Sequence, residues 1–343
     1  MTDDQWHVED FEAGDLALAS GATLHNARLR YHRLGKLNAP KDNLILLPTY
    51  YGGAASGNHP WVTPGGPLDP ERYCLVIPAL IGAGESASPS NTPGRQGGAG
   101  FPVVSLYDNV RLQRRLLDAV FGGARLALVM GWSMGGMQAL HWGALFPDRV
   151  SAILAVCASG RCHPFNRMFL EGVRAALTAD PAWAGGHYRQ PPRQGLAAFG
   201  RVYAGWAYAP AFFRQRLYRR LGFDSPEALL AFWARDHQAQ DANDLLSVLT
   251  TWSQADLADH PRFAGDGAAA RARLTMPCTL MPCTSDQYFR VEEVEAEAAG
   301  MPGARVRPLA SSFGHIAGGP GRVPEVQRAV LREAARLLAG DAP

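Results

Sequence analysis

The sequence predicts an α/β protein with a doubly wound, mostly parallel sheet and a helical segment inserted between two late strands. Short apolar runs alternate with helix-length segments through the first half of the 343-residue chain. The runs are almost continuously apolar, as in parallel strands that are buried on both faces. The alternation stops near Ser159, where a helical and aromatic segment begins, and it resumes near Thr275. These three observations define the fold class.

The elements follow in order along the chain. Residues 15–35 alternate apolar and polar side chains around Ser20 and Gly21, which predicts a β-hairpin. Before the break, buried strands are expected at residues 43–48, 73–80, 125–130 and 151–156, and helices at residues 107–121 and 134–146. After the break, strands are expected at residues 275–283 and 304–310, and helices at residues 291–300 and 323–338.

The interrupted rhythm predicts two structural units. Residues 1–160 and 271–343 would form an α/β core, and residues 161–270 a helical cap over the carboxyl ends of the strands, where such sheets bind ligands. The cap holds Trp183, Trp206, Trp233 and Trp252, half of the eight tryptophans. Each of them also fits an ordinary place in the core of the cap.

Composition limits the possible partners. The 33 basic and 31 acidic residues are spread along the chain and give a net charge of +2. This charge pattern does not indicate binding to nucleic acid or to an anionic membrane. The five cysteines form no C-x-x-C pair, and no His, Asp or Glu cluster has metal-ligand spacing, so we expect neither disulfides nor a metal. The acidic start and the lack of a long apolar run favour the cytoplasm. A small-molecule partner is expected.

Gly131, Trp132, Ser133, Met134 and Gly135 match the G-x-S-x-G pattern of a nucleophile elbow. The match stands in the required context, between an expected strand and an expected helix. Glycine is needed on either side because the turn is too tight for side chains there. Ser133 is therefore a candidate nucleophile, and the alternative is a small residue in a tight turn.

A serine nucleophile needs a base and an acid that orients the base, and in this fold they follow in the order Ser, Asp or Glu, His. His315 lies in a glycine-flanked loop directly after the last expected strand and is the only histidine beyond the cap. Asp286 lies just beyond the strand at residues 275–283, 29 residues before His315. Both positions suit a triad with Ser133.

The oxyanion of an acyl-transfer intermediate needs two backbone donors. One is expected to be the N–H after the nucleophile, that of Met134. The other should come from the loop after an early strand, and the Thr49-Tyr50-Tyr51-Gly52-Gly53 loop makes the N–H of Tyr50 the best candidate.

The string Ser-Met-Gly-Gly-Met-Gln-Ala-Leu from Ser133 to Leu140, with the segments at residues 29–48, 63–86 and 101–120, resembles the homoserine O-acyltransferase family of the α/β-hydrolase superfamily. The resemblance covers nearly the whole core and is weaker through the cap. It implies a triad of Ser133, Asp286 and His315, an acyl-serine intermediate in a ping-pong reaction, and a homodimer joined through cap helices.

The chain departs from the family pattern beside the triad. Transferases of this family place an aspartate after the catalytic histidine, expected to hold the amino acid acceptor, whereas this chain has Ile316. The family elbow begins Gly-Gly-Ser, whereas this chain has Trp132. A family arginine associated with the acceptor carboxylate loosely corresponds to Arg201. Trp132, Arg201 and Ile316 are therefore candidate substrate contacts.

An isoleucine in place of a buried carboxylate disfavours a zwitterionic acceptor. The favoured function is hydrolysis of small acyl esters, with no cofactor. The alternative is transfer of an acyl group from acyl-CoA, as co-substrate, to homoserine or another alcohol. A third hypothesis is a non-catalytic protein that binds a ligand under the cap, although no triad member is missing.

Overall fold

The computed structural model describes residues 5–340. The predicted core also included residues 1–4 and 341–343, which lie outside the described residues. Eight strands form one sheet in the order β1-β2-β4-β3-β5-β6-β7-β8. The strands are β1 (His7–Ala17), β2 (Thr23–Leu34), β3 (Leu44–Leu46), β4 (Cys74–Pro78), β5 (Leu126–Trp132), β6 (Ile153–Val156), β7 (Cys278–Met281) and β8 (Ala304–Val306). Strand β2 pairs antiparallel with both β1 and β4, and every other pair of neighbours in this sheet is parallel.

Ten α-helices accompany the strands in the described part of the chain. They are α1 (Leu106–Val120), α2 (Met134–Leu145), α3 (Pro164–Thr178), α4 (Arg193–Ala207), α5 (Pro210–Arg214), α6 (Pro226–Gln238), α7 (Ala242–Ser253), α8 (Gly267–Arg271), α9 (Val291–Ala298) and α10 (Pro324–Leu338). Each predicted strand and helix of the core is confirmed, with bounds that differ by a few residues. The hairpin is longer than predicted because β1 begins at His7.

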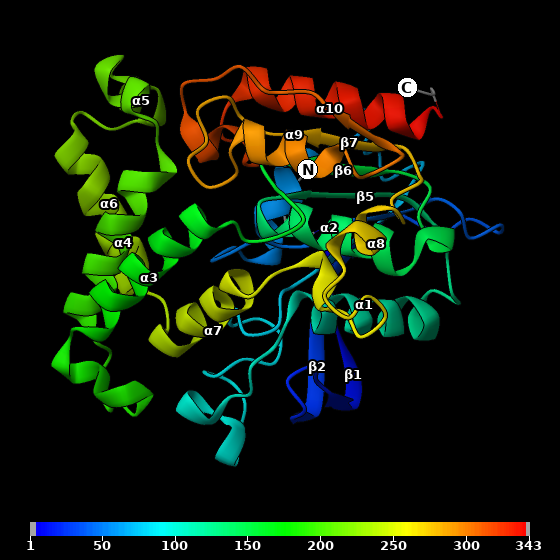
Figure 1. Ribbon diagram of the computed structural model, residues 1–343. Helices are drawn as coiled ribbons and strands as arrows, with labels where there is room; N and C mark the ends of the chain where they lie inside the picture. Colours follow the sequence, from blue (N-terminus) through cyan, green and yellow to red (C-terminus); the bar gives the residue numbers. More distant parts are fainter. Residues whose placement is uncertain (1–4, 341–343) are drawn as a thin grey trace.

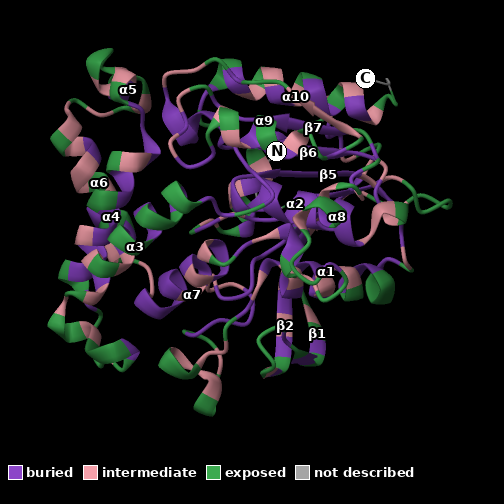
Figure 2. Ribbon diagram, viewed as in Figure 1, coloured by how far each residue is buried: buried purple, intermediate pink, exposed green. Residues whose placement is uncertain are grey.

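The sheet is covered on both faces. Helices α2 and α10 both contact β5 and β6, and Figure 1 shows α9 and α10 on one side of these strands and α1 and α2 on the other. The side chains of β3, β4, β6 and β7 are buried throughout, as the purple centre of Figure 2 shows. The doubly wound, mostly parallel fold class is thereby confirmed.

All the elements between β6 and β7 are helical in the described chain. Helices α3, α4, α5 and α6 gather to one side of the sheet in Figure 1. We call residues 161–270 the cap segment. Phe169, Phe199 and Trp252 of this segment are buried, and they pack against Tyr51 and Tyr288 from outside it. No helix among residues 5–340 is long and apolar enough to cross a membrane.

Candidate active site

Ser133 lies in the sharp turn between β5 and α2, with φ 56° and ψ −130°. A positive φ is unfavourable for a residue with a Cβ atom and costs on the order of 1–3 kcal/mol. The neighbouring glycines allow the turn: a Cβ on Gly131 would come within 2.1 Å of the Gly135 carbonyl carbon, and one on Gly135 within 2.4 Å of the Pro48 carbonyl oxygen. The predicted steric role of these glycines is therefore what the structure shows.

The three predicted triad side chains meet at this turn, although they come from distant parts of the chain. His315 Nε2 lies 2.9 Å from Ser133 Oγ, and its Nδ1 lies 2.7 Å from Asp286 Oδ2. All three residues are buried. Because the carboxylate can only accept, Nδ1 carries the proton and the lone pair of Nε2 faces the serine hydroxyl. This is the tautomer that a general base requires.

Hydrogen bonds hold the loops that carry Asp286 and His315 in place. The second carboxylate oxygen of Asp286 accepts the backbone N–H of Tyr288 at 2.8 Å and that of Phe289 at 3.3 Å. Ser285 Oγ accepts the N–H of Gly314 at 3.0 Å and donates to the carbonyl of Ser311 at 2.7 Å. The Asp286 loop is thus hydrogen bonded directly to the loop that carries His315.

The His315 ring is enclosed by aromatic side chains. Trp132 stacks on it with ring centres 4.9 Å apart, and the Trp132 indole N–H donates to the His315 carbonyl at 3.2 Å. Tyr288 meets the ring edge-on at 4.7 Å, and Phe289 lies at 5.6 Å. The bulky residue before the nucleophile therefore packs on the histidine as well as lining the cavity described below.

The loop after β3 lies against the start of α2, where the Met134 N–H has no acceptor within the helix. Gln138 on α2 donates to the Thr49 carbonyl at 2.8 Å and to the Met134 carbonyl at 3.2 Å. The peptide between Thr49 and Tyr50 is planar and trans, so a carbonyl turned toward Gln138 directs the Tyr50 N–H away from it. No acceptor among residues 5–340 takes this N–H.

Two further buried residues fix the direction of the Gln138 amide. The indole of Trp142, which can only donate, gives a hydrogen bond to Gln113 Oε1 at 2.8 Å. Gln113 then donates through Nε2 to Gln138 Oε1 at 2.7 Å. Gln138 must therefore present its NH₂ group to the loop carbonyl. A donor-only atom sets the orientation of both amides.

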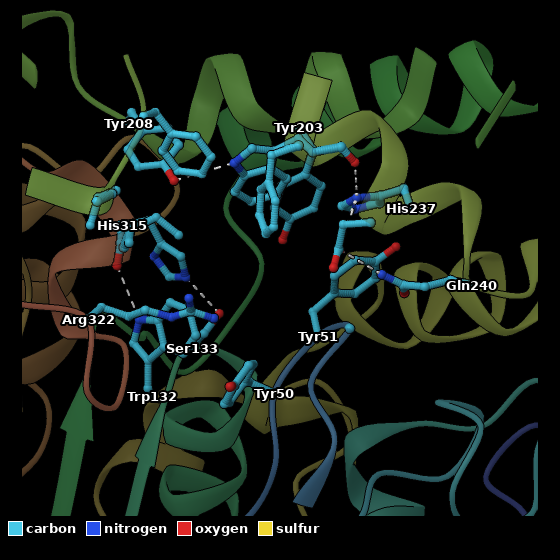
Figure 3. A pocket seen from close by; sticks show the side chains of 17 residues that line it. Tyr50, Tyr51, Trp132, Ser133, Tyr203, Tyr208, His237, Gln240, His315 and Arg322 are labelled. Atoms are coloured by element: carbon cyan, nitrogen blue, oxygen red, sulfur yellow. Dashed lines mark hydrogen bonds and ion pairs between the residues drawn. The ribbon is translucent and has the colours of Figure 1, made fainter. Parts of the chain in front are cut away.

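A cavity of about 350 Å³ opens above Ser133 (Figure 3). Residues outside the cap segment contribute Tyr50, Trp132, Ser133, His315 and Ile316 to its wall, together with the three named last below. The cap segment contributes Tyr203, Tyr208, Leu221, Phe223, Phe232, Trp233, Asp236, His237 and Gln240, and the remaining lining residues are Tyr51, Gly52 and Arg322. The cavity is thus mainly aromatic on the cap side.

The structure corrects one candidate contact. Arg201 lies on an exposed part of α4 and does not line the cavity. The correspondence with the family arginine was loose in the cap. In the structure the Arg201 side chain lies on the solvent side of α4. Arg322, in the loop that follows His315, lines the cavity instead. Ile316 and Trp132 do lie at the cavity wall.

Sequence reasoning missed most of the cap residues in this wall. Tyr203 and His237 are buried members of α4 and α6, and no motif marks them. The available signal was the density of aromatic residues in the cap segment, which indicates packing as readily as binding. Arg322 had a weak signal, since it follows the candidate histidine by only seven residues.

The triad region also contains the group of described residues with metal-like spacing, Cys157, Asp286 and His315. Asp286 and His315 are hydrogen bonded to each other. Burial raises the pKa of the Cys157 thiol well above its usual value, which disfavours the thiolate that a metal would need. Asp286 and His315 are instead hydrogen bonded to each other and to Ser133, as the predicted triad requires.

Comparison with known proteins agrees with this geometry. The family model described as "alpha/beta hydrolase fold" matches residues 42–307. Ethyl acetate hydrolase of Pseudomonas veronii is 34% identical over 88% of this chain and 87% of its own length. Homoserine O-acetyltransferase of Chlorobium chlorochromatii is 33% identical over 87% of each chain. The acetyl esterase MekB superposes with a TM-score of 0.94, at 32% identity and over 99% of each chain.

The chain therefore belongs to the α/β-hydrolase family. More closely, it is a homoserine O-acetyltransferase-like member, an enzyme of the hydrolase and acyltransferase type, as the motifs predicted.

Proposed function

We propose that this enzyme hydrolyses small carboxylic esters of the acetyl type through an acyl-serine intermediate. The observation that carries the proposal is the hydrogen-bonded series Ser133, His315 and Asp286, with links of 2.9 and 2.7 Å, at the base of the cavity. The esterase relatives support hydrolysis of a short acyl ester.

The chemistry proceeds in two balanced halves. As the Ser133 oxygen attacks the ester carbonyl, its proton moves to His315 Nε2, and Asp286 stabilises the imidazolium. His315 then returns the proton to the departing alcohol, and the carbon–oxygen bond to that alcohol breaks. In the second half, His315 takes a proton from water, the hydroxide attacks the acyl-serine, and Ser133 leaves with the proton as the acid is released.

Backbone donors hold the negative oxygen of each tetrahedral intermediate. We assign this role to the N–H groups of Met134 and Tyr50. The first begins α2, where the helix has unsatisfied donors, and the second is oriented by the Gln138 contact with Thr49. Removal of one such donor typically costs about a hundredfold to a thousandfold in turnover.

The first test is hydrolysis of p-nitrophenyl acetate by the purified chain. Ser133→Ala should lower turnover by at least about a thousandfold, because no nucleophile remains. Circular dichroism should show an unchanged fold. Ser20→Ala, in the exposed turn between β1 and β2, is the matched control and should keep full activity. Full activity in Ser133→Ala would contradict the proposal.

A second candidate is transfer of an acetyl group from acetyl-CoA to an alcohol such as homoserine, favoured by the homoserine O-acetyltransferase relatives. The same residues would form the acyl-serine, and acyl-CoA would be the co-substrate. The apolar Ile316 beside His315 argues for water as acceptor, because it offers no partner for an ammonium group. Formation of O-acetylhomoserine faster than acetate in the presence of both compounds would reverse this ranking.

A non-catalytic ligand-binding role is the remaining alternative. It would leave the serine, histidine and aspartate without a reason to be in hydrogen-bond contact. Loss of hydrolysis in Ser133→Ala with retained binding of an ester analogue would separate catalysis from binding.

We further propose that residues 161–270 form a cap unit on a core of residues 1–160 and 271–343, and that two copies associate through cap helices. Apolar side chains on α3 and α4 favour such contact, since Met168 is 73% exposed and Phe165 and Val202 are also exposed. Light scattering should show a dimer, and Met168→Glu should shift it toward monomer. Five free, buried cysteines fit the reducing cytoplasm.

A further inference from the structure

The cap side of the cavity contains a buried histidine that the proposed reaction does not use. His237 is only 5% exposed and lies across the cavity from Ser133 and His315 in Figure 3. Its Nδ1 lies 2.9 Å from the Trp233 carbonyl oxygen. A carbonyl can only accept, so Nδ1 carries a proton and donates to Trp233.

The other ring nitrogen of His237 is a hydrogen-bond acceptor that no group among the described residues uses. Burial lowers the pKa of His237, so the ring is neutral at pH 7 and Nε2 carries a lone pair. Within residues 5–340, the hydrogen bond to Trp233 and the close contact with the Asp236 carboxylate both involve Nδ1. The backbone of Gly200 packs against the Nδ1 edge, whereas the ring as a whole lines the cavity.

A second polar group lies beside it. The Tyr203 ring is stacked between Tyr51, at 5.5 Å, and Trp233, at 5.6 Å, and its centre is 6.0 Å from that of His237. In the described part of the chain its hydroxyl makes no hydrogen bond, although the residue lines the cavity. Burial raises the pKa of Tyr203 far above pH 7, so the hydroxyl stays protonated and can donate.

We propose that His237 Nε2 and the Tyr203 hydroxyl form a subsite for a free hydroxyl group on the alcohol portion of the ester. A hydroxyl group matches this pair because it donates to the Nε2 lone pair and accepts from the phenol at once. The mainly aromatic wall of the cavity suits an apolar or aromatic body. The substrate class is therefore acetyl esters of hydroxylated, mainly apolar alcohols, which deepens the proposed function and rests on it.

Other end groups fit the subsite less well. A carboxylate would face a neutral imidazole together with Asp236, whose carboxylate oxygen lies 3.5 Å from His237 Nδ1. A methyl group would leave Nε2 and the phenol against apolar surface without a hydrogen-bond partner, which is unfavourable for buried polar groups. The cavity of about 350 Å³ falls in the range of roughly 300–1,000 Å³ for drug-sized ligands. A small ester such as ethyl acetate would fill only part of it.

The experiment compares two pairs of acetates that differ only in one hydroxyl group. The pairs are 2-phenylethyl acetate with 2-(4-hydroxyphenyl)ethyl acetate, and the corresponding 3-phenylpropyl compounds. At one or both lengths, the native enzyme should show kcat/KM at least about tenfold higher for the hydroxylated acetate, since a site built for a hydroxyl rejects the analogue that lacks it.

Variants assign the preference to the subsite. His237→Phe and Tyr203→Phe should each reduce the ratio of the two kcat/KM values toward one, whatever the absolute rates. His237→Gln keeps an acceptor oxygen and should retain part of the ratio. Arg235→Gln, on an exposed position of the same helix, is the matched control and should leave the ratio unchanged.

The proposal is overturned if the native ratio is near one at both lengths, or if it persists in both phenylalanine variants. Either result leaves the proposed function intact when the acetates are hydrolysed in a Ser133-dependent way. Absence of Ser133-dependent hydrolysis of every acetate, including p-nitrophenyl acetate, would instead contradict the proposed function.

Discussion

The two carboxylate oxygens of Asp286 have separate partners. Oδ2 accepts from His315, and Oδ1 accepts from the backbone of its own loop. In the proposed triad, one oxygen therefore orients the base, while the other accepts a hydrogen bond from the loop itself. The position of this residue at the end of β7 and its order before the histidine made it predictable from sequence, because the order of triad residues is fixed in this fold.

Replacement of Asp286 by asparagine should keep the conformation of the loop but should favour the opposite tautomer of His315. The amide oxygen can still accept from Tyr288, and the NH₂ group would then face Nδ1 and favour the wrong tautomer. We expect kcat for p-nitrophenyl acetate to fall by about 10⁴-fold with the fold unchanged. A loss of less than about tenfold would show that Asp286 does not orient the base.

Ile316 gives a second prediction at the residue scale. Ile316→Asp introduces a carboxylate into the cavity wall beside His315, where it can pair with an ammonium group. The ratio of O-acetylhomoserine to acetate formed from acetyl-CoA and homoserine should rise by about tenfold or more, because a buried charge pair discriminates strongly. Ile316→Asn, of similar size and without charge, is the matched control, and an equal rise there would contradict the charge argument.

Among the elements, helix α2 does more than present the nucleophile. Its Gln138 side chain donates a hydrogen bond to the Thr49 carbonyl in the loop after β3, so one helix contacts both parts of the proposed oxyanion site. The strand, turn and helix were predicted from the G-x-S-x-G pattern, but this contact was not. A glutamine inside a helix has no sequence signature that tells which carbonyl it will meet.

Gln138→Met should test the positioning role. Methionine keeps similar length and volume but cannot donate, so the Tyr50 peptide loses its restraint. We expect kcat to fall by about tenfold to a hundredfold with little change in KM, as for a misplaced catalytic group. Gln113→Met removes only the hydrogen bond that orients Gln138 and should lower kcat less. An unchanged kcat in Gln138→Met, with loss of stability alone, would reduce Gln138 to a structural residue.

The elements of the core could be predicted because buried parallel strands are short apolar runs between amphipathic helices. The cap could be predicted as helical, but the face of each helix that turns toward the cavity could not. Arg201 and Tyr203 lie two positions apart on α4, yet one is exposed and the other lines the cavity. Only the packing of α4 against α3 and α6 decides which face turns inward.

For the molecule as a whole, Asp244 on α7 links the cap segment to the loop after β4. Its carboxylate accepts the Ser90 N–H at 2.9 Å and the Ser90 hydroxyl at 2.6 Å. Burial raises the pKa of Asp244 from 3.8 to about 6, despite these hydrogen bonds. The native state thus holds a proton between pH 4 and 6 that the unfolded chain has released.

This proton sets a pH dependence of stability. Because the folded state binds more protons in that window, the contribution of Asp244 to the free energy of unfolding falls as the pH rises from 4 to 6. Asp244→Asn keeps an acceptor and removes the titration. Its stability relative to the native chain should therefore increase by up to about 3 kcal/mol between pH 4 and 7. Urea unfolding at several pH values measures this difference, and parallel curves would contradict the prediction.

The residues of the cavity wall come from two separate parts of the chain, and this separation bears on how such enzymes diversify. On this wall Ser133 and His315 are placed by the sheet and its loops, whereas Tyr203, Trp233 and His237 come from the helices between β6 and β7. Mutations that reshape the cap can change which alcohol is accepted while the bond-breaking atoms stay in register. The insertion is therefore the part of this molecule in which new substrate ranges can evolve, or be selected in the laboratory, at least risk to catalysis.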